Sequence, residues 1–188
     1  MRLMAFQGDV SRNRVVHVLE QLGNTPAPDG IFVNSKGGEF EFFSVLGPAL
    51  QKRAIVTLAG NVESAAVMLF LLGHRRYALP DATFFFHEIY TVSDAGGMVT
   101  IADLNGYMER EREMGKKGSE THQEWLRGMR MAQSWFADFV GQRLNLRPAV
   151  ILDLMRQEAT LEARDAVRYG LVHRIIPHRE ALGTFKII

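Results

Sequence analysis

The sequence predicts an α/β domain with a mostly parallel β-sheet. Short apolar runs alternate with segments of helical periodicity, and this alternation is typical of βα units. One predicted helix, 65–72, is apolar on all sides, which indicates a fully buried element. A long stretch, 99–146, is mostly helical in its pattern. We therefore expect a single domain over residues 1–188 that carries a helical arm at 99–146.

The first half of the chain contains the predicted strands. Ser11 is the expected N-cap of a first helix, whose buried stripe follows at helical spacing. A second helix is expected at 42–52, and Gly60 is expected to turn the third strand toward helix 65–72. The buried stripe of the first helix consists of Val15, Val18, Leu19 and Leu22. The strands are expected at 3–6, 31–34, 54–59, 77–79 and 83–86, separated by Gly, Pro, Asp or Asn.

The second half is predicted to be helical and to end in a strand. Residues 109–117 are strongly charged, and we interpret them as a solvated helix end or loop. Pro148 opens a short helix to 155, a further helix at 162–169 ends at Gly170, and 171–176 is a closing strand. The arm carries an apolar stripe of period 3.6 made of Trp125, Met129, Ala132, Phe136, Phe139 and Val140.

Composition excludes several classes of protein. The chain has 188 residues, of which 47% are hydrophobic and 23% charged, so it is neither disordered nor fibrous. Its 22 basic and 21 acidic residues give no electrostatic reason to expect nucleic acid or an anionic membrane as partner. The absence of Cys excludes thiol catalysis and disulfides. No apolar run could span a bilayer, and the turn at Gly8 comes too early for a signal peptide, so we expect a cytoplasmic protein.

Two positions combine a reactive side chain with a suggestive local pattern. Ser64 stands where a strand meets a buried helix, which would present its hydroxyl at the helix N-terminus beside the Ala65 N–H. The alternative is that Ser64 is an ordinary N-cap, a position that favours Ser. His87 follows a predicted strand and is either a general base or a structural histidine. No motif for a metal site or a nucleotide-binding loop is present, so we expect neither metal nor cofactor.

Four segments, taken in order, resemble the Clp protease proteolytic subunit family (ClpP), within the wider ClpP/crotonase fold. Residues 33–38 (VNSKGG) are similar to the family's INSPGG, and 60–64 (GNVES) to its GQAAS. Leu79-Pro80, followed by His87, is similar to the segment that carries the family's general base. Residues 165–172 (DAVRYGLV) are similar to EAVEYGLV. The likeness covers nearly the whole chain.

The resemblance implies a spiral of ββα units with a helical handle. It also implies a serine endopeptidase that cleaves peptides or unfolded protein through an acyl-enzyme, without metal or organic cofactor. Ser64 would be the nucleophile, His87 the base and Glu158 the acid of the triad. Asp153 is the alternative acid. The oxyanion hole would consist of the backbone amides of Gly37, Gly38 and Ala65.

Several features depart from the family pattern. Lys36 replaces a Pro, Glu63 stands beside the nucleophile where the family has a small residue, and His173 replaces an Asp. A carboxylate next to Ser64 would repel acidic substrates. The chain begins at its first strand, without the family's preceding helix and axial loop, and its arm is longer, around 109–123. We therefore expect a homo-oligomer, because the arm joins stacked rings in the family, but not a standard ATPase-fed barrel.

Two alternatives belong to other functional classes. The chain could be a catalytically weak or inactive subunit that keeps the fold for assembly, which the Glu158 substitution and the apolar stripe favour. It could also be a crotonase-like acyl-CoA enzyme, in which the same two amides would polarise a thioester. The second alternative leaves the pair of Ser64 and His87 unexplained, and no basic cluster is evidently placed for the CoA phosphates.

Overall fold

The chain folds into two compact units in the computed structural model, and the predicted mixed α/β class is confirmed. Unit 1 comprises residues 1–86 and 159–188, and unit 2 comprises residues 87–158. That residues 1–188 form one domain stays a prediction. The structure describes residues 1–39, 54–93, 96–115 and 120–188, so the helix expected at 42–52 lies outside the described residues.

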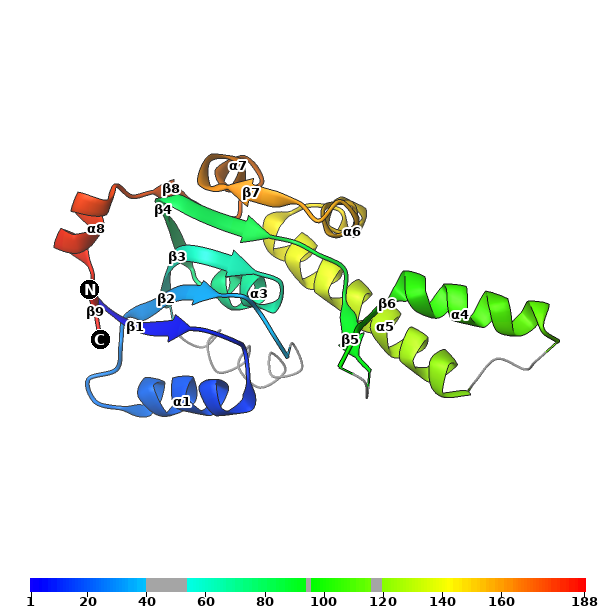
Figure 1. The fold of residues 1–188 in the computed structure, drawn as a ribbon. Coiled ribbons are helices and arrows are strands. Elements are labelled where there is room, and N and C mark those ends of the chain that lie inside the picture. The colour runs from blue at the N-terminus through cyan, green and yellow to red at the C-terminus, as the bar shows by residue number, and fades with distance from the viewer. Residues whose placement is uncertain (40–53, 94–95, 116–119) are drawn as a thin grey trace. The chain divides into compact units, whose positions relative to one another are not determined.

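Unit 1 is built on a seven-stranded sheet (Figure 1). Its strands are β1 (Arg2–Gln7), β2 (Gly30–Ser35), β3 (Val56–Glu63), β4 (Arg75–Phe85), β7 (Thr160–Glu162), β8 (Arg174–Ile175) and β9 (Lys186–Ile187). The order is β7-β4-β3-β2-β1-β9, and β8 also pairs with β4. All pairs are parallel except β4 with β7. The carboxyl ends of β1 to β4 therefore lie at the same edge of the sheet.

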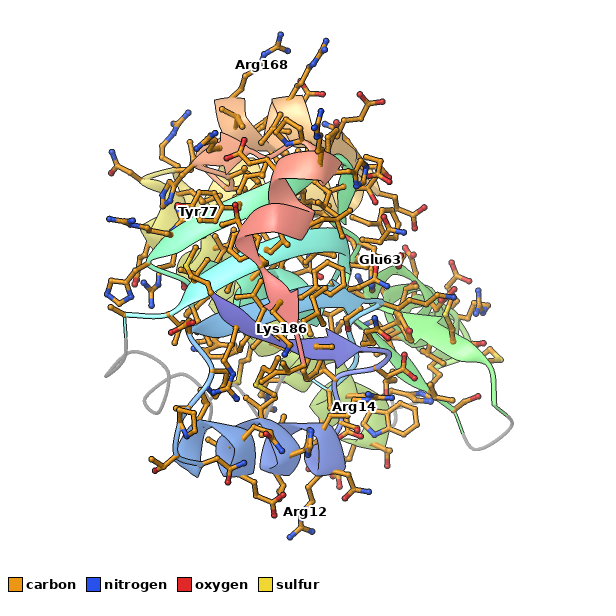
Figure 2. All side chains as sticks on the ribbon, turned by 90° about the vertical axis from the view of Figure 1, so that its left-hand side faces the viewer. Arg12, Arg14, Glu63, Tyr77, Arg168 and Lys186 are labelled. Carbon is orange, nitrogen blue, oxygen red and sulfur yellow. The ribbon has the colours of Figure 1, made fainter. Side chains whose placement is uncertain are left out.

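Helices cover both faces of this sheet. They are α1 (Arg12–Gly23), α3 (Ala65–Leu71), α7 (Ala163–Arg168) and α8 (His178–Thr184). Every residue of α3 is buried, as its apolar sequence predicts, and the Thr57 hydroxyl fixes the helix to the sheet by donating to the Phe70 carbonyl at 2.9 Å. Helix α8 crosses in front of the strands in Figure 2. Its end packs into a cluster that includes Leu3, Leu58, Ala181 and Phe185.

Two predictions about β3 and β4 are wrong. Strand β3 does not end at Gly60 but continues to Glu63, and the runs 77–79 and 83–86 belong largely to one strand, β4. The reason is a shift in register. Ala59 pairs with Ala78, whereas Asn61 pairs with Thr83, so β4 contains extra residues opposite Gly60. Pro80, which has no N–H to donate, lies within that irregular part.

The ends of unit 1 differ in detail from the prediction. Ser11 occupies the N-cap position of α1, but its side chain makes no capping hydrogen bond. Gly170 follows α7 with φ 77°, as expected for a residue that ends a helix in the left-handed conformation. The closing strand predicted at 171–176 is reduced to β8. The short elements β7, α8 and β9 have no counterpart among the predicted elements.

Unit 2 is mostly helical, and that residues 99–146 form a handle-like arm stays a prediction. A hairpin of β5 (Tyr90–Val92) and β6 (Met98–Thr100) precedes α4 (Ile101–Glu113), α5 (Glu120–Leu144) and α6 (Pro148–Arg156). The charged residues at 109–113 form the solvated end of α4, as interpreted. Of the predicted stripe, Met129, Ala132, Phe136 and Val140 are buried. Within the described parts of the chain, no helix combines the length and apolar character that a membrane span requires.

A buried arginine holds the C-terminal part of unit 1 to β4. The Arg76 guanidinium donates to the carbonyls of Leu171, Gly170 and Gly73 at 2.7, 2.9 and 3.3 Å. The Arg76 N–H donates to His173 Nδ1 at 3.2 Å. Partial burial, together with the positive charge of Arg76, lowers the pKa of His173. The neutral form of His173 is therefore favoured beside the Arg76 cation.

We predict that Arg76→Met lowers the free energy of unfolding by about 3 kcal/mol. The substitution keeps the apolar stem but leaves buried carbonyls without their donor, which typically costs about 1–3 kcal/mol for each group. Chemical denaturation measures the loss. Arg75→Met is the matched control, because Arg75 is the neighbouring residue and is exposed. Equal stability of the two variants would contradict the anchoring role of Arg76.

Candidate active site

Ser64 sits at a sharply strained junction between β3 and α3. Its φ of 52° and ψ of −127° are rare for a residue with a side chain. The Ser64 N–H donates to the Phe85 carbonyl at 2.9 Å, and its own carbonyl accepts from the Val67 N–H at 3.0 Å. The Ser64 side chain makes no capping hydrogen bond, although the residue occupies the N-cap position. A strained strand-to-helix turn of this kind presents the nucleophile in α/β-hydrolases.

Gly37 packs directly against this junction. A Cβ atom added to Gly37 would lie 2.7 Å from Ser64 Cβ, 2.7 Å from the Glu63 carbonyl oxygen and 3.0 Å from the Ala65 nitrogen. Its φ of 87° also favours glycine. A residue with a side chain could not approach the Ser64 junction so closely without displacing it. The predicted loop and the predicted nucleophile are therefore neighbours in unit 1.

The loop that contains Gly37 is fixed from the other side by β1 and the residues after it. The Gly37 carbonyl accepts from the Val10 N–H at 2.6 Å, and the Val10 carbonyl accepts from the Glu39 N–H at 3.0 Å. The Gly37 N–H donates to Ser35 Oγ at 3.1 Å. Gly38 faces Val10 in this parallel bridge, but its own N–H takes no part in the pairing.

The three amides predicted for an oxyanion hole differ in their backbone surroundings, and their role stays a prediction. The Gly37 N–H is already donated within the loop, whereas the Gly38 N–H lies outside the bridge pairing. The Ala65 N–H belongs to the first turn of α3, where backbone donors have no partner inside the helix. Gly37 instead contributes close packing.

Two asparagine side chains, which the sequence analysis does not single out, connect neighbouring strands close to this loop. Asn34 Oδ1 accepts from the Asn61 N–H at 3.0 Å, and Asn61 Oδ1 accepts from the Thr83 hydroxyl at 3.2 Å. These bonds join β2, β3 and β4 where their register is irregular. The signal was present in the VNSKGG segment, since an Asn within an apolar strand needs a polar partner.

His87 opens unit 2 and is half-buried. Its Nδ1 lies 2.6 Å from the Glu88 carbonyl oxygen. A carbonyl can only accept, so this contact favours the tautomer with the proton on Nδ1 and leaves Nε2 as an acceptor. The ring also stacks on Tyr90, with centroids 5.5 Å apart and planes at 30°. Both contacts restrict the orientation of the imidazole.

The two candidate acids lie at the end of α6. Glu158 is exposed, has φ 48°, and donates its backbone N–H to the Met155 carbonyl at 3.1 Å. Its carboxylate makes no hydrogen bond or ion pair with the described residues of unit 2. Asp153 pairs with Arg156 at 2.8 Å on the surface. The role of either residue in a triad stays a prediction. Among the described residues, no group of three His, Cys, Asp or Glu side chains is arranged to hold a metal ion.

The mixed α/β fold is consistent with a ClpP-type α/β protein, and one sequence comparison points in the same direction at a distance. The chain is 26% identical over 166 residues to the ATP-dependent Clp protease proteolytic subunit 2 of Pseudomonas aeruginosa. The match covers 86% of this chain and 71% of that protein. No protein-family model matches the chain. These findings support a remote ClpP-like relationship.

We predict that Gly37→Ala destabilises unit 1 and deforms the junction. The added methyl group would overlap backbone and Cβ atoms, and the left-handed φ adds a penalty of about 1 kcal/mol. We expect a total loss of about 2–4 kcal/mol in the free energy of unfolding. Gly23→Ala is the control, because nothing lies within 4 Å of its added Cβ. If both variants were as stable as the parent protein, the close packing at Gly37 would be refuted.

Proposed function

We propose that this chain is a ClpP-like serine endopeptidase that cleaves peptides or unfolded protein. The observation that carries the proposal is the strained Ser64 junction with Gly37 packed against it. A purely structural N-cap has ordinary extended backbone and uses its side chain to cap the helix. Ser64 does neither, and strain of this kind accumulates at functional sites.

Chain connectivity supports His87 as the base. His87 is two residues beyond Phe85, whose carbonyl accepts the Ser64 N–H. His87 therefore follows, within two residues along the chain, the residue of unit 1 that binds the Ser64 backbone. The contact of Nδ1 with the Glu88 carbonyl favours the tautomer in which Nε2 can take a proton.

In the proposed reaction, His87 Nε2 takes the proton of Ser64 as Oγ bonds to the peptide carbonyl carbon. The carbonyl oxygen becomes an oxyanion, which the N–H groups of Gly38 and Ala65 stabilise. The C–N bond then breaks, and the imidazolium gives its proton to the leaving amine. Water, deprotonated by His87, hydrolyses the acyl-enzyme and restores Ser64. Glu158 is proposed to stabilise the imidazolium.

A second function is favoured by one observation. The exposed Glu158 carboxylate has no partner among the described residues of unit 2, which fits an inactive subunit that keeps the fold for assembly. Loss of the acid–histidine link lowers the rate of a serine protease by about 10⁴. Activity measurements therefore decide between the two functions.

We predict that a fluorophosphonate probe labels Ser64 in the native protein and that Ser64→Ala and His87→Ala abolish labelling. Mass spectrometry locates the adduct. Glu158→Gln should label more slowly but measurably, because the Glu88 carbonyl still holds the imidazole. Thermal unfolding of each variant checks that the fold is intact. A folded parent protein that does not react would favour the inactive assembly subunit.

Self-association is part of the proposal, and unit 2 supplies its surface. Of the fourteen large hydrophobic residues that are exposed among the described residues, eight belong to unit 2. Large apolar side chains that remain exposed on one unit are candidates for burial in an interface. The eight are Tyr90, Val92, Met98, Tyr107, Met114, Trp125, Met131 and Trp135.

We predict that the protein is oligomeric at micromolar concentration and that Met131→Glu combined with Trp135→Glu dissociates it. Both side chains lie on α5, and a charge buried in an interface without a partner is unfavourable. Sedimentation velocity measures the size. Leu182→Glu is the control, since Leu182 is 85% exposed on α8 of unit 1. A monomeric parent protein would overturn the prediction.

A further inference from the structure

Glu63 places a carboxylate beside the proposed nucleophile. It is the last residue of β3 and directly precedes Ser64. Its backbone carbonyl is one of the atoms against which Gly37 packs. The side chain is half-buried, and among the described residues no hydrogen bond or ion pair engages its carboxylate. The charge is therefore not neutralised by a close partner there.

The sheet determines the side on which this carboxylate lies. Side chains alternate along a strand, so Glu63 points to the side opposite Val62, which is fully buried. Asn61 shares the side of Glu63 and is exposed. Glu63 therefore lies on the solvent-facing side at the carboxyl end of β3. A peptide approaching the Ser64 hydroxyl from solvent would come near this charge.

A charge of the opposite sign directly follows the neighbouring strand. Ser35, the last residue of β2, pairs with Val62 of β3, and Lys36 comes next in the chain, one residue before the Gly37 that packs against the Glu63 carbonyl. Lys36 is exposed, and Gly37 after it packs against Ser64. Two opposite charges thus flank the proposed reaction centre.

These observations lead to a statement about substrate. We propose that Glu63 makes the site prefer peptides with a basic residue next to the scissile bond over peptides with an acidic one, and that Lys36 weakens this preference. The inference rests on the proposed peptidase function and adds the charge of the preferred substrate. Two unit charges several ångströms apart in partly exposed surroundings change a rate by about tenfold.

The test uses three internally quenched peptides that differ only in the residues flanking one cleavage site, which are Lys, Glu or Gln. The measured quantity is the ratio of kcat/KM for the Lys peptide to that for the Glu peptide, with the cleavage site mapped by mass spectrometry. We expect a ratio of about ten or more in the parent protein. The ratio should fall toward one as ionic strength rises, because salt screens charges at partly exposed sites.

Paired substitutions separate charge from packing. Glu63→Gln keeps the shape of the side chain and should bring the ratio to one or below, because the charge of Lys36 remains, whereas Lys36→Gln should raise it. Glu20→Gln is the control, because Glu20 is exposed on α1 and its loss changes the net charge equally. It should leave the ratio unchanged. A structural role for Glu63 would not produce opposite effects in the Glu63 and Lys36 variants.

The outcomes distinguish this inference from the function on which it rests. If the parent protein cleaves the Gln peptide but Glu63→Gln keeps the parent ratio, the inference is wrong and the peptidase function stands. The same holds if the parent ratio is near one at low salt. If no peptide is cleaved and the fluorophosphonate probe does not label Ser64, the proposed function itself fails, and the inference fails with it.

Discussion

The backbone conformation of Ser64 is the constraint on which the rest of unit 1 depends. A φ of 52° at a residue with a side chain persists only where the surrounding structure holds it. Two backbone hydrogen bonds hold it, one to Phe85 of β4 and one from Val67 of α3. The register shift between β3 and β4 brings Phe85 level with Glu63 and so makes the first bond possible. The irregular pairing is thus a condition for the junction rather than a defect of the sheet.

The second support comes from the glycine loop that follows β2, the strand that lies between β1 and β3 in the sheet. The Gly37 carbonyl accepts from the Val10 N–H after β1, and a Cβ added at Gly37 would lie 2.7 Å from Ser64 Cβ. Because β2 lies between β1 and β3, the Gly37 loop that follows β2 lies beside the Ser64 junction that follows β3. Parallel pairing makes this arrangement natural, because the carboxyl ends of the strands meet at one edge, where loops of open α/β sheets bind ligands.

Much of this could be predicted from the sequence, and the failures have physical causes. The all-apolar run of α3 and the alternation of strands and helices fixed the fold class, because periodicity reports burial directly. The turn was misplaced at Gly60, because glycine marks turns in general and the strain at Ser64 has no sequence signature. Strand β4 was divided at Pro80, since the extra residues of its register shift depend on pairing with β3. Short elements such as β9 form only through long-range contacts.

The structure explains why positions 36 and 63 can differ from the ClpP-like motif while position 37 keeps its glycine. Position 37 requires glycine, because any side chain there would collide with the Ser64 junction. Lys36 and Glu63 are constrained only through their backbones: the first is exposed, and the second packs through its carbonyl. Side chains at these two positions can therefore change without deforming the site. Substitution there alters the charge beside the proposed nucleophile while leaving the Ser64 junction intact, and substrate specificity is the property that such a change can alter most directly.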